Sequence, residues 1–185
     1  YQGLFCVVSD PVDPLCRAVL RESNRDENGR PDGRGLRPCQ VRGFGLGVMH
    51  ARALYYAKKD PRFTDFLTDG RSFGPHGEDL VLANSIEHYD DALSRELTEK
   101  VAHANLDMRR LGYKPYVAPA LSSGALTLLA LLRGQWHYAS VYMDGIFMGC
   151  RQRLTPSGIE VERLTLPDAL QKRLDTTAAR LRAID

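Results

Sequence analysis

The stretch of sequence that decides the fold class is WHYASVYMDGIFMGCRQR, residues 136–153. It contains two segments rich in aromatic and branched side chains, and the Asp144-Gly145 pair between them is typical of a two-residue hairpin turn. A second turn signal, at residues 155–158, precedes a third segment of the same kind. The sequence therefore predicts three consecutive antiparallel strands, over Trp136 to Met143, Ile146 to Arg153 and Ile159 to Leu166.

Helices are predicted on both sides of these strands, because apolar residues recur there every three or four positions. The longest such pattern runs from about Leu80 to Arg110, and the others cover residues 14–22, 48–59 and 119–132. A closing helix has Pro167 in its first turn. Its apolar face consists of Leu170, Leu174, Ala178 and Leu181.

Two more strands are predicted before these three. Leu4 to Val8 is a continuous apolar run, typical of a strand buried on both faces, and Phe63 to Thr68 alternates like a strand. Residues 24–38 carry seven charges and two prolines, which predicts an exposed loop. One strand, then helices, then an antiparallel meander and a closing helix make an α+β fold, with long helices packed on an antiparallel sheet.

Composition places the chain among ordinary globular domains. Its 185 residues suffice for one domain, or a domain with an appendage, and the 43% hydrophobic and 26% charged content excludes a disordered chain. The net charge of +2 gives no electrostatic reason to expect nucleic acid or an anionic membrane as a partner. The longest uncharged run, residues 116–132, contains a proline and fits a buried helix better than a membrane span.

The four cysteines are far apart in the sequence and form no C-x-x-C pair. They predict reduced, mostly buried thiols of an intracellular, cytoplasmic protein, with no disulfide framework and no zinc site. No signal peptide opens the chain, and the absence of an initial methionine suggests a piece of a longer protein.

The first candidate binding motif is Gly43-Phe44-Gly45-Leu46-Gly47, which opens a predicted helix and has Asp65 about 20 residues further on. Glycines at a helix N-terminus can let the backbone approach a pyrophosphate. The spacing fails at the third glycine of the dinucleotide fingerprint, where Val48 stands. Close packing between a strand and a helix is therefore the favoured explanation of these glycines.

Three further places carry residues suited to catalysis or binding. His76, in Gly74-Pro75-His76-Gly77, is a loop histidine that could act as a general acid or base. Arg52, two residues after His50, offers a guanidinium that can bind a carboxylate through two hydrogen bonds. Ser9-Asp10-Pro11 follows the first predicted strand, at the end where ligands of α/β sheets collect. A surface histidine, a helix salt-bridge partner and a plain turn are the structural alternatives.

The order of these motifs resembles the lactate/malate dehydrogenase family, from the last strand of its dinucleotide-binding domain to the C-terminus. That family has a Val-Val-Ser-Asn-Pro-Val-Asp stretch, then Gly-x-Gly-x-x-Leu-Asp-x-Ala-Arg, then Gly-Glu-His-Gly-Asp. Residues 7–13, 43–52 and 74–78 are similar to these three motifs in turn. Leu111-Gly112-Tyr113 and residues 140–145 resemble the family's Lys-Gly-Tyr helix and a later hairpin.

The resemblance implies roles for four residues. Arg52 would bind the substrate carboxylate, and His76 would be the catalytic residue that donates and accepts the proton. Asp10 would face the substrate oxygen, and Ser9 and Asp10 would contact the cofactor, NAD. Asp10 departs from the family's asparagine, which puts a potential negative charge beside an anionic 2-oxo acid.

A second departure is Met49, which stands where the family has the aspartate that holds the histidine. A thioether is a weak hydrogen-bond acceptor, so the histidine would lose its orienting partner. Glu78, Asp79 or Asp10 could replace that partner in space.

By this resemblance, residues 1–22 are the last strand and helix of a truncated dinucleotide-binding domain, 23–38 an exposed loop, and 39–185 the substrate-binding, catalytic domain. The implied protein is an NAD-dependent oxidoreductase acting on a small 2-oxo or 2-hydroxy acid of the lactate or malate type, and a homo-oligomer. The chain by itself is expected to be inactive, because the dinucleotide fingerprint is not in it.

Two alternatives stay open. The first is a family member that has lost catalysis and acts as a ligand-binding or assembly protein, as Asp10 and Met49 suggest. The second is a metal-dependent glycosidase on the same fold, although the sequence has no evident cluster of metal-ligating residues.

Overall fold

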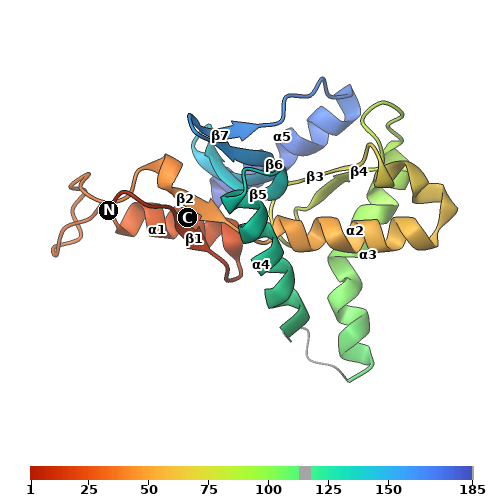
Figure 1. Ribbon diagram of the computed structural model, residues 1–185, viewed down its shortest axis with the longest axis horizontal. Helices are drawn as coiled ribbons and strands as arrows, with labels where there is room; N and C mark the ends of the chain where they lie inside the picture. The colour runs from red at the N-terminus through yellow and green to blue at the C-terminus, as the bar shows by residue number, and fades with distance from the viewer. Residues whose placement is uncertain (113–117, 185) are drawn as a thin grey trace.

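The computed structural model describes residues 1–112 and 118–184, which form an α+β fold built on a five-stranded sheet (Figure 1). The strand order is β1-β2-β5-β6-β7; β1 and β2 pair in parallel and the other neighbours are antiparallel. The strands are β1 (Phe5–Val7), β2 (Val41–Gly43), β5 (His137–Met143), β6 (Ile146–Thr155) and β7 (Gly158–Val161). A separate two-stranded sheet contains β3 (Arg71–Phe73) and β4 (Val81–Ala83).

The described residues contain five α-helices. They are α1 (Val12–Glu22), α2 (Leu46–Lys59), α3 (Asp91–Arg110), α4 (Ala118–Leu132) and α5 (Asp168–Ala183), and two short 3-10 helices are η1 (Pro38–Gln40) and η2 (Pro61–Leu67). Helices α3 and α4 project beyond the body of the molecule at the same edge (Figure 1). The predicted helices over residues 14–22, 48–59, 119–132 and after Pro167 are thus confirmed, whereas Tyr113 of the Leu-Gly-Tyr motif lies outside the described residues.

The predicted antiparallel meander is confirmed. Asp144 and Gly145 both have positive φ, 47° and 84°, as a type I′ turn requires, and they set the register in which Ser140 pairs with Gly149. The third strand is shorter than predicted, because β7 ends at Val161. Leu164 and Leu166 leave the sheet and pack against the apolar cluster beneath α5.

The prediction of one helix from Leu80 to Arg110 was wrong in its first third. Residues 81–83 form strand β4, and helix α3 begins only at Asp91. The intervening turn is held by Asp69, whose carboxylate accepts hydrogen bonds from the main-chain N–H groups of Ile86 and Glu87. Ile86 therefore packs on the core from a loop, at a spacing that imitates a helix.

The strand predicted over Phe63 to Thr68 was also wrong, since this segment is the 3-10 helix η2. Pro61 lies in its first turn, and the side chain of Asp60 accepts a hydrogen bond from the N–H of Arg62. Phe63 and Phe66 are fully buried. Residues three apart share a face in a 3-10 helix but point to opposite faces in a strand. Only the 3-10 helix therefore allows both phenylalanines to be buried on the same side.

The first strand is an edge strand and is not buried on both faces as predicted. Phe5 is 43% and Val8 53% exposed, and only Val7 is buried. The loop at residues 24–38 is exposed, as predicted, and extends from the end of α1 (Figure 1).

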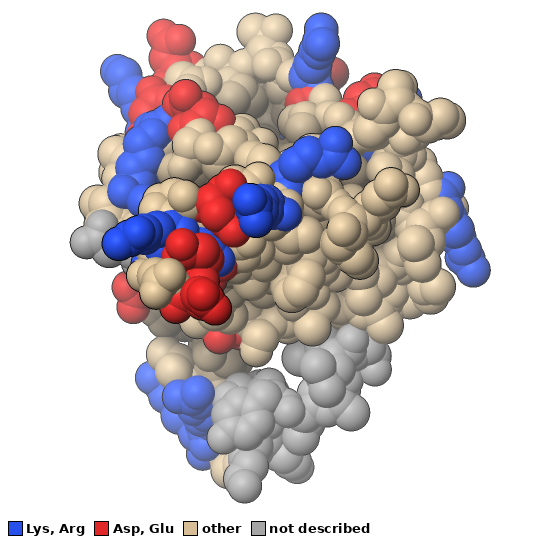
Figure 2. Space-filling model, turned by 90° about the vertical axis from the view of Figure 1, so that its left-hand side faces the viewer, with Lys and Arg blue, Asp and Glu red and all other residues tan. Residues whose placement is uncertain are grey.

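Charges are mixed over the surface at this end of the molecule. Figure 2 shows basic and acidic side chains interspersed there, with no large area of one sign. The four thiols are free; Cys16 and Cys150 are buried, which raises the pKa of each to about 12, whereas Cys6 is half-buried. The expectation of mostly buried thiols was wrong for Cys39, which is exposed.

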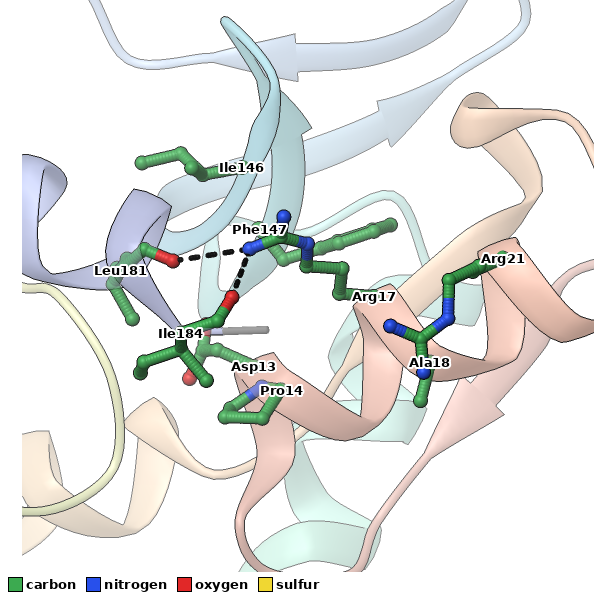
Figure 3. A pocket seen from close by; sticks show the side chains of 9 residues that line it. All are labelled: Asp13, Pro14, Arg17, Ala18, Arg21, Ile146, Phe147, Leu181 and Ile184. Atoms are coloured by element: carbon green, nitrogen blue, oxygen red, sulfur yellow. Dashed lines mark hydrogen bonds between the residues drawn. The ribbon is translucent and has the colours of Figure 1, made fainter.

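Arg17 connects helix α1 to the end of helix α5 through hydrogen bonds. Its guanidinium donates hydrogen bonds to the main-chain carbonyls of Leu181 and Ile184, at the end of α5 (Figure 3). A cation at a helix C-terminus is favourable, because it compensates the unpaired carbonyl groups there. Helices α1 and α5 thereby enclose a small cavity, which Asp13 also lines (Figure 3).

Candidate substrate pocket

The predicted site residues meet in one pocket. The end of β1, the start of α2, the loop after β3 and the facing sides of α3 and α4 enclose a cavity of about 560 Å³, a size typical of small-molecule sites. Its polar lining consists of Ser9, Asp10, Arg52, His76, Asn105 and Arg109.

The imidazole of His76 is held by the main chain. Its Nδ1 lies 3.1 Å from the carbonyl oxygen of Gly45, and because a carbonyl can only accept, Nδ1 carries the proton. In the neutral ring Nε2 then carries the free lone pair. The Oδ2 atom of Asp10 lies 3.9 Å from Nε2, so a protonated imidazole would have a carboxylate beside it.

The glycine run at residues 43–47 makes this approach possible. A Cβ atom on Gly45 would lie 2.9 Å from Cβ of His76 and 2.9 Å from Cγ2 of Val12. A Cβ on Gly43 would meet Val12 at 2.5 Å, and one on Gly47 would meet Thr127 at 2.5 Å. The space around these glycines is thus filled by the protein itself, which confirms the packing explanation and leaves no cradle for a pyrophosphate.

Arg52 extends from α2 into the same pocket. Its guanidinium is half-buried, and this burial lowers its pKa while Tyr56 and Asp10 act to raise it. Among the described residues its one hydrogen-bond acceptor is Sδ of Met49, at 3.5 Å. Because a thioether satisfies little of a guanidinium's hydrogen-bonding capacity, Arg52 is suited to bind a carboxylate.

Met49 itself is a core residue, only 1% exposed. Of the three carboxylates considered as replacements for the missing aspartate, only Asp10 lies beside His76. Asp79 forms an ion pair with Arg180 at 2.6 Å, and Glu78 and Asp79 line a different groove, against α5. The orienting group that the sequence did not reveal is the carbonyl of Gly45.

His50 lies outside the pocket. Its ring stacks on Tyr138, with 3.9 Å between the centroids, and contacts Phe66, while Nδ1 lies 2.9 Å from Oγ of Ser72. Burial, with smaller contributions from two nearby arginines, lowers the pKa of His50 to about 4. This histidine is therefore a neutral part of the core.

The sequence analysis did not identify three residues that lie near the site. Asn105 and Arg109 extend from α3, and their spacing of four positions puts them on one helix face, although the sequence could not show that this face borders the pocket. Asp13, in the first turn of α1, is buried, and its Oδ1 accepts a hydrogen bond of 2.6 Å from Ser140.

Two further properties concern metals and membranes. In residues 1–112 and 118–184, no three side chains of His, Cys, Asp or Glu gather as a metal ion would require. Over the same residues, no helix combines the length and apolar character that crossing a membrane demands.

Comparison with known proteins gives a structural match only. No family model and no curated protein sequence matches the chain. Among solved structures, malate dehydrogenase from Archaeoglobus fulgidus in complex with NADH superposes with a TM-score of 0.69 and 18% sequence identity, over 97% of this chain. The chain spans 59% of the length of that enzyme. The likeness establishes that the chain has a malate dehydrogenase-like fold, and thus confirms the resemblance at the level of the fold.

Proposed function

We propose that this chain is the substrate-binding half of an NAD-dependent dehydrogenase that acts on small 2-hydroxy and 2-oxo acids. Residues 1–22 would belong to the cofactor-binding half, 23–38 to an exposed loop and 39–185 to the substrate domain. The observation that carries the proposal is that Arg52 and His76 line the same cavity. One group binds a carboxylate and the other transfers a proton, as interconversion of a hydroxy acid and an oxo acid needs.

Arg52 binds the substrate carboxylate through its planar pair of N–H donors. The negative charge of a bound carboxylate would offset the cost of keeping the guanidinium half-buried. Asn105 and Arg109 border the far side of the same cavity. A second guanidinium there supports a substrate with a second anionic group, as in a malate-type acid.

His76 transfers the proton at the substrate oxygen. In the oxidation direction the neutral ring accepts the hydroxyl proton at Nε2, while the carbonyl of Gly45 holds the Nδ1–H group and so fixes the tautomer. In the reduction direction the imidazolium donates that proton to the carbonyl oxygen. The Asp10 carboxylate, 3.9 Å from Nε2, stabilises the imidazolium but opposes an anionic substrate.

This chain fits only one end of the cofactor. NAD, when bound, supplies the hydride chemistry at the substrate carbon. Ser9 and Asp10 lie at the edge of the pocket, at the end of β1, and would contact the nicotinamide end. Side chains fill the space beside the glycines at 43–47, so this run does not hold the cofactor phosphates.

The test is turnover by the full-length protein with NADH and a panel of 2-oxo acids, followed by absorbance at 340 nm. The proposal expects reduction of at least one 2-oxo acid, and loss of this reduction in His76→Asn. The chain at residues 1–185 is expected to bind NADH too weakly to detect by calorimetry. Turnover that is undiminished in His76→Asn would refute the assignment.

A second candidate function follows from Met49 and Asp10. With a core methionine at position 49 and a carboxylate at position 10, the same pocket could bind a 2-oxo acid without converting it. Calorimetric binding of a 2-oxo acid that depends on Arg52, together with absence of turnover, would support this non-catalytic alternative.

Self-association is part of the proposal. Helix α4 exposes Leu126, Leu129 and Leu132, three residues apart from each other, on one side. An apolar strip of this kind is typical of a surface that is covered in an assembly. Sedimentation of the full-length protein would show the oligomer, and Leu129→Asp would weaken it.

A further inference from the structure

We propose that Asp13 is a positioning residue for His76: a buried carboxyl group that joins the His76 loop to the central sheet and whose protonation changes the setting of the imidazole. The inference rests on the proposed function only in taking His76 as the residue that transfers the proton.

The first link runs through the sheet. Asp13 is 3% exposed, and its Oδ1 accepts a hydrogen bond of 2.6 Å from Oγ of Ser140 in β5. Ser140 pairs with Gly149 of β6, whose carbonyl accepts a hydrogen bond of 3.0 Å from the N–H of Gly74. Gly74 begins the loop that carries His76, so Asp13 and this loop are fixed to the same pair of strands.

The second link is one of proximity. The main-chain N–H of His76 lies near enough to the Asp13 carboxyl group to favour its ionised form. Val12, the residue before Asp13, packs with His76 on either side of Gly45, whose carbonyl holds the imidazole. A shift of the first turn of α1 would therefore move both the main chain and the ring of His76.

No arginine or lysine of the described residues forms an ion pair with the Asp13 carboxyl group. Of the two arginines that line the nearby cavity with Asp13, Arg17 directs its guanidinium to the end of α5 and Arg21 pairs with Glu22 (Figure 3). The other titratable groups facing Asp13 are Asp10, which opposes a second negative charge, and His76 itself with Cys16.

Burial raises the pKa of Asp13 to about 7, against the opposite effect of the Ser140 hydrogen bond and of the nearby His76 main chain. Asp13 therefore changes its charge near neutral pH. As a carboxylate it accepts the Ser140 hydrogen bond and attracts the His76 N–H group, whereas protonation removes the charge and weakens its hold on the loop. Most buried aspartates that only complete a core would have no such effect on a catalytic ring.

The test follows the ring of His76 by NMR, with 13C in the imidazole, over pH 5 to 9 in the full-length protein. Besides its own titration, the His76 signal should show a second inflection from Asp13. Asp13→Asn should remove this inflection, and Ser140→Ala should move it to higher pH, because the hydrogen bond that stabilises the carboxylate is lost. Two controls should retain it: Asp10→Asn, at the other carboxylate near the ring, and Asp79→Asn, on the same loop but paired with Arg180.

The pH profile of turnover gives a second readout. The profile of Asp13→Asn should lose the limb that coincides with the inflection, with kcat reduced about tenfold and KM for the 2-oxo acid unchanged. An inflection that persists in Asp13→Asn, or that disappears in Asp10→Asn, would overturn the inference. If Asp13→Asn does not fold, an unmoved inflection in Ser140→Ala would overturn it equally. The NMR result does not need turnover, so an inactive protein that shows the Asp13 inflection would refute the proposed function and leave this inference standing.

Discussion

Helix α2 borders two regions of opposite character, each with a histidine at its centre. On one side, Val48 and Arg52 line the pocket of His76, whose Nδ1 is held by a carbonyl oxygen. On the other, His50 packs against Tyr138 and Phe66, and its Nδ1 lies beside the Ser72 hydroxyl.

The difference shows what makes a histidine available for chemistry. Both rings have a hydrogen-bonded Nδ1, but His76 lines a cavity of about 560 Å³ together with Asp10 and Arg52, whereas the ring of His50 stacks on Tyr138. Burial lowers the pKa of His50 to about 4 and keeps it neutral. Under the proposed function the pocket of His76 serves proton transfer, whereas His50 serves packing.

The largest effect is expected for His76→Asn. Loss of a positioned general acid and base lowers rates by about 10²- to 10⁴-fold, so kcat of the full-length protein should fall by this amount with little change in stability. His88→Asn, at an exposed histidine, is the control and should keep the wild-type rate. Equal rates for both variants would remove the distinction between the pocket and the rest of the surface.

Part of the fold and of the pocket was predictable from the sequence. The Asp-Gly pair predicted the turn of the antiparallel meander, and the motifs around Asp10, Arg52 and His76 predicted residues that the structure brings into one pocket. Local patterns carried this information, because a turn or a helix face depends on neighbours in the chain.

Other parts depend on contacts between distant segments and could not be predicted. Phe63 and Phe66 matched a strand pattern, yet packing made their segment a 3-10 helix. The carbonyl of Gly45 can orient His76 only because residues 31 positions apart meet. Asp13 is joined to the sheet by a hydrogen bond from Ser140, a residue 127 positions away in the chain. No local pattern encodes such pairs.

The next largest effect is expected for Arg52→Gln. Removing one partner of a desolvated, charged hydrogen-bonded pair costs about 2–5 kcal/mol, so the affinity for a carboxylate substrate should fall by roughly 30-fold or more. Calorimetry with a 2-oxo acid, and KM where turnover is present, would measure the loss. Lys58→Gln, at an exposed position of the same helix, removes an equal charge and should change affinity by less than about twofold. A twofold effect for Arg52→Gln would make it an ordinary surface charge.

His50 should instead control stability at acidic pH. Its folded-state pKa of about 4 lies below the value near 6.5 of an unfolded chain. The stabilisation from the neutral ring is therefore present above pH 6.5 and is lost as the pH falls toward 4. The stability of the wild type relative to His50→Gln should therefore decrease by about 2–3 kcal/mol over this range; the difference is used because buried Asp13, with its raised pKa, contributes in the opposite direction to both proteins. Urea titrations of both proteins measure this difference, and exposed His103→Gln should show no such dependence on pH. A difference between wild type and His50→Gln that stays constant from pH 6.5 to 4.5 would contradict a buried neutral His50.

The smallest effect is expected for Arg109, which decides how far the pocket discriminates between substrates. Arg109 lies in the last turn of α3 and is exposed, so its attraction to an anion is screened by water and should contribute less than about 1 kcal/mol. Arg109→Leu should weaken binding of a dicarboxylic 2-oxo acid by about two- to fivefold and leave a monocarboxylic one unchanged, because only the former has a second charge for α3. Arg110→Leu is the matched control. It removes the same charge at the next position of the chain, and Arg110 is not among the residues that line the cavity. The effect of Arg109→Leu on binding of the dicarboxylic acid should become smaller at high salt, because salt screens the interaction between an exposed guanidinium and a carboxylate. An equal loss for both acids would mean that Arg109 binds the same carboxylate as Arg52, and that the pocket selects for a monocarboxylic substrate.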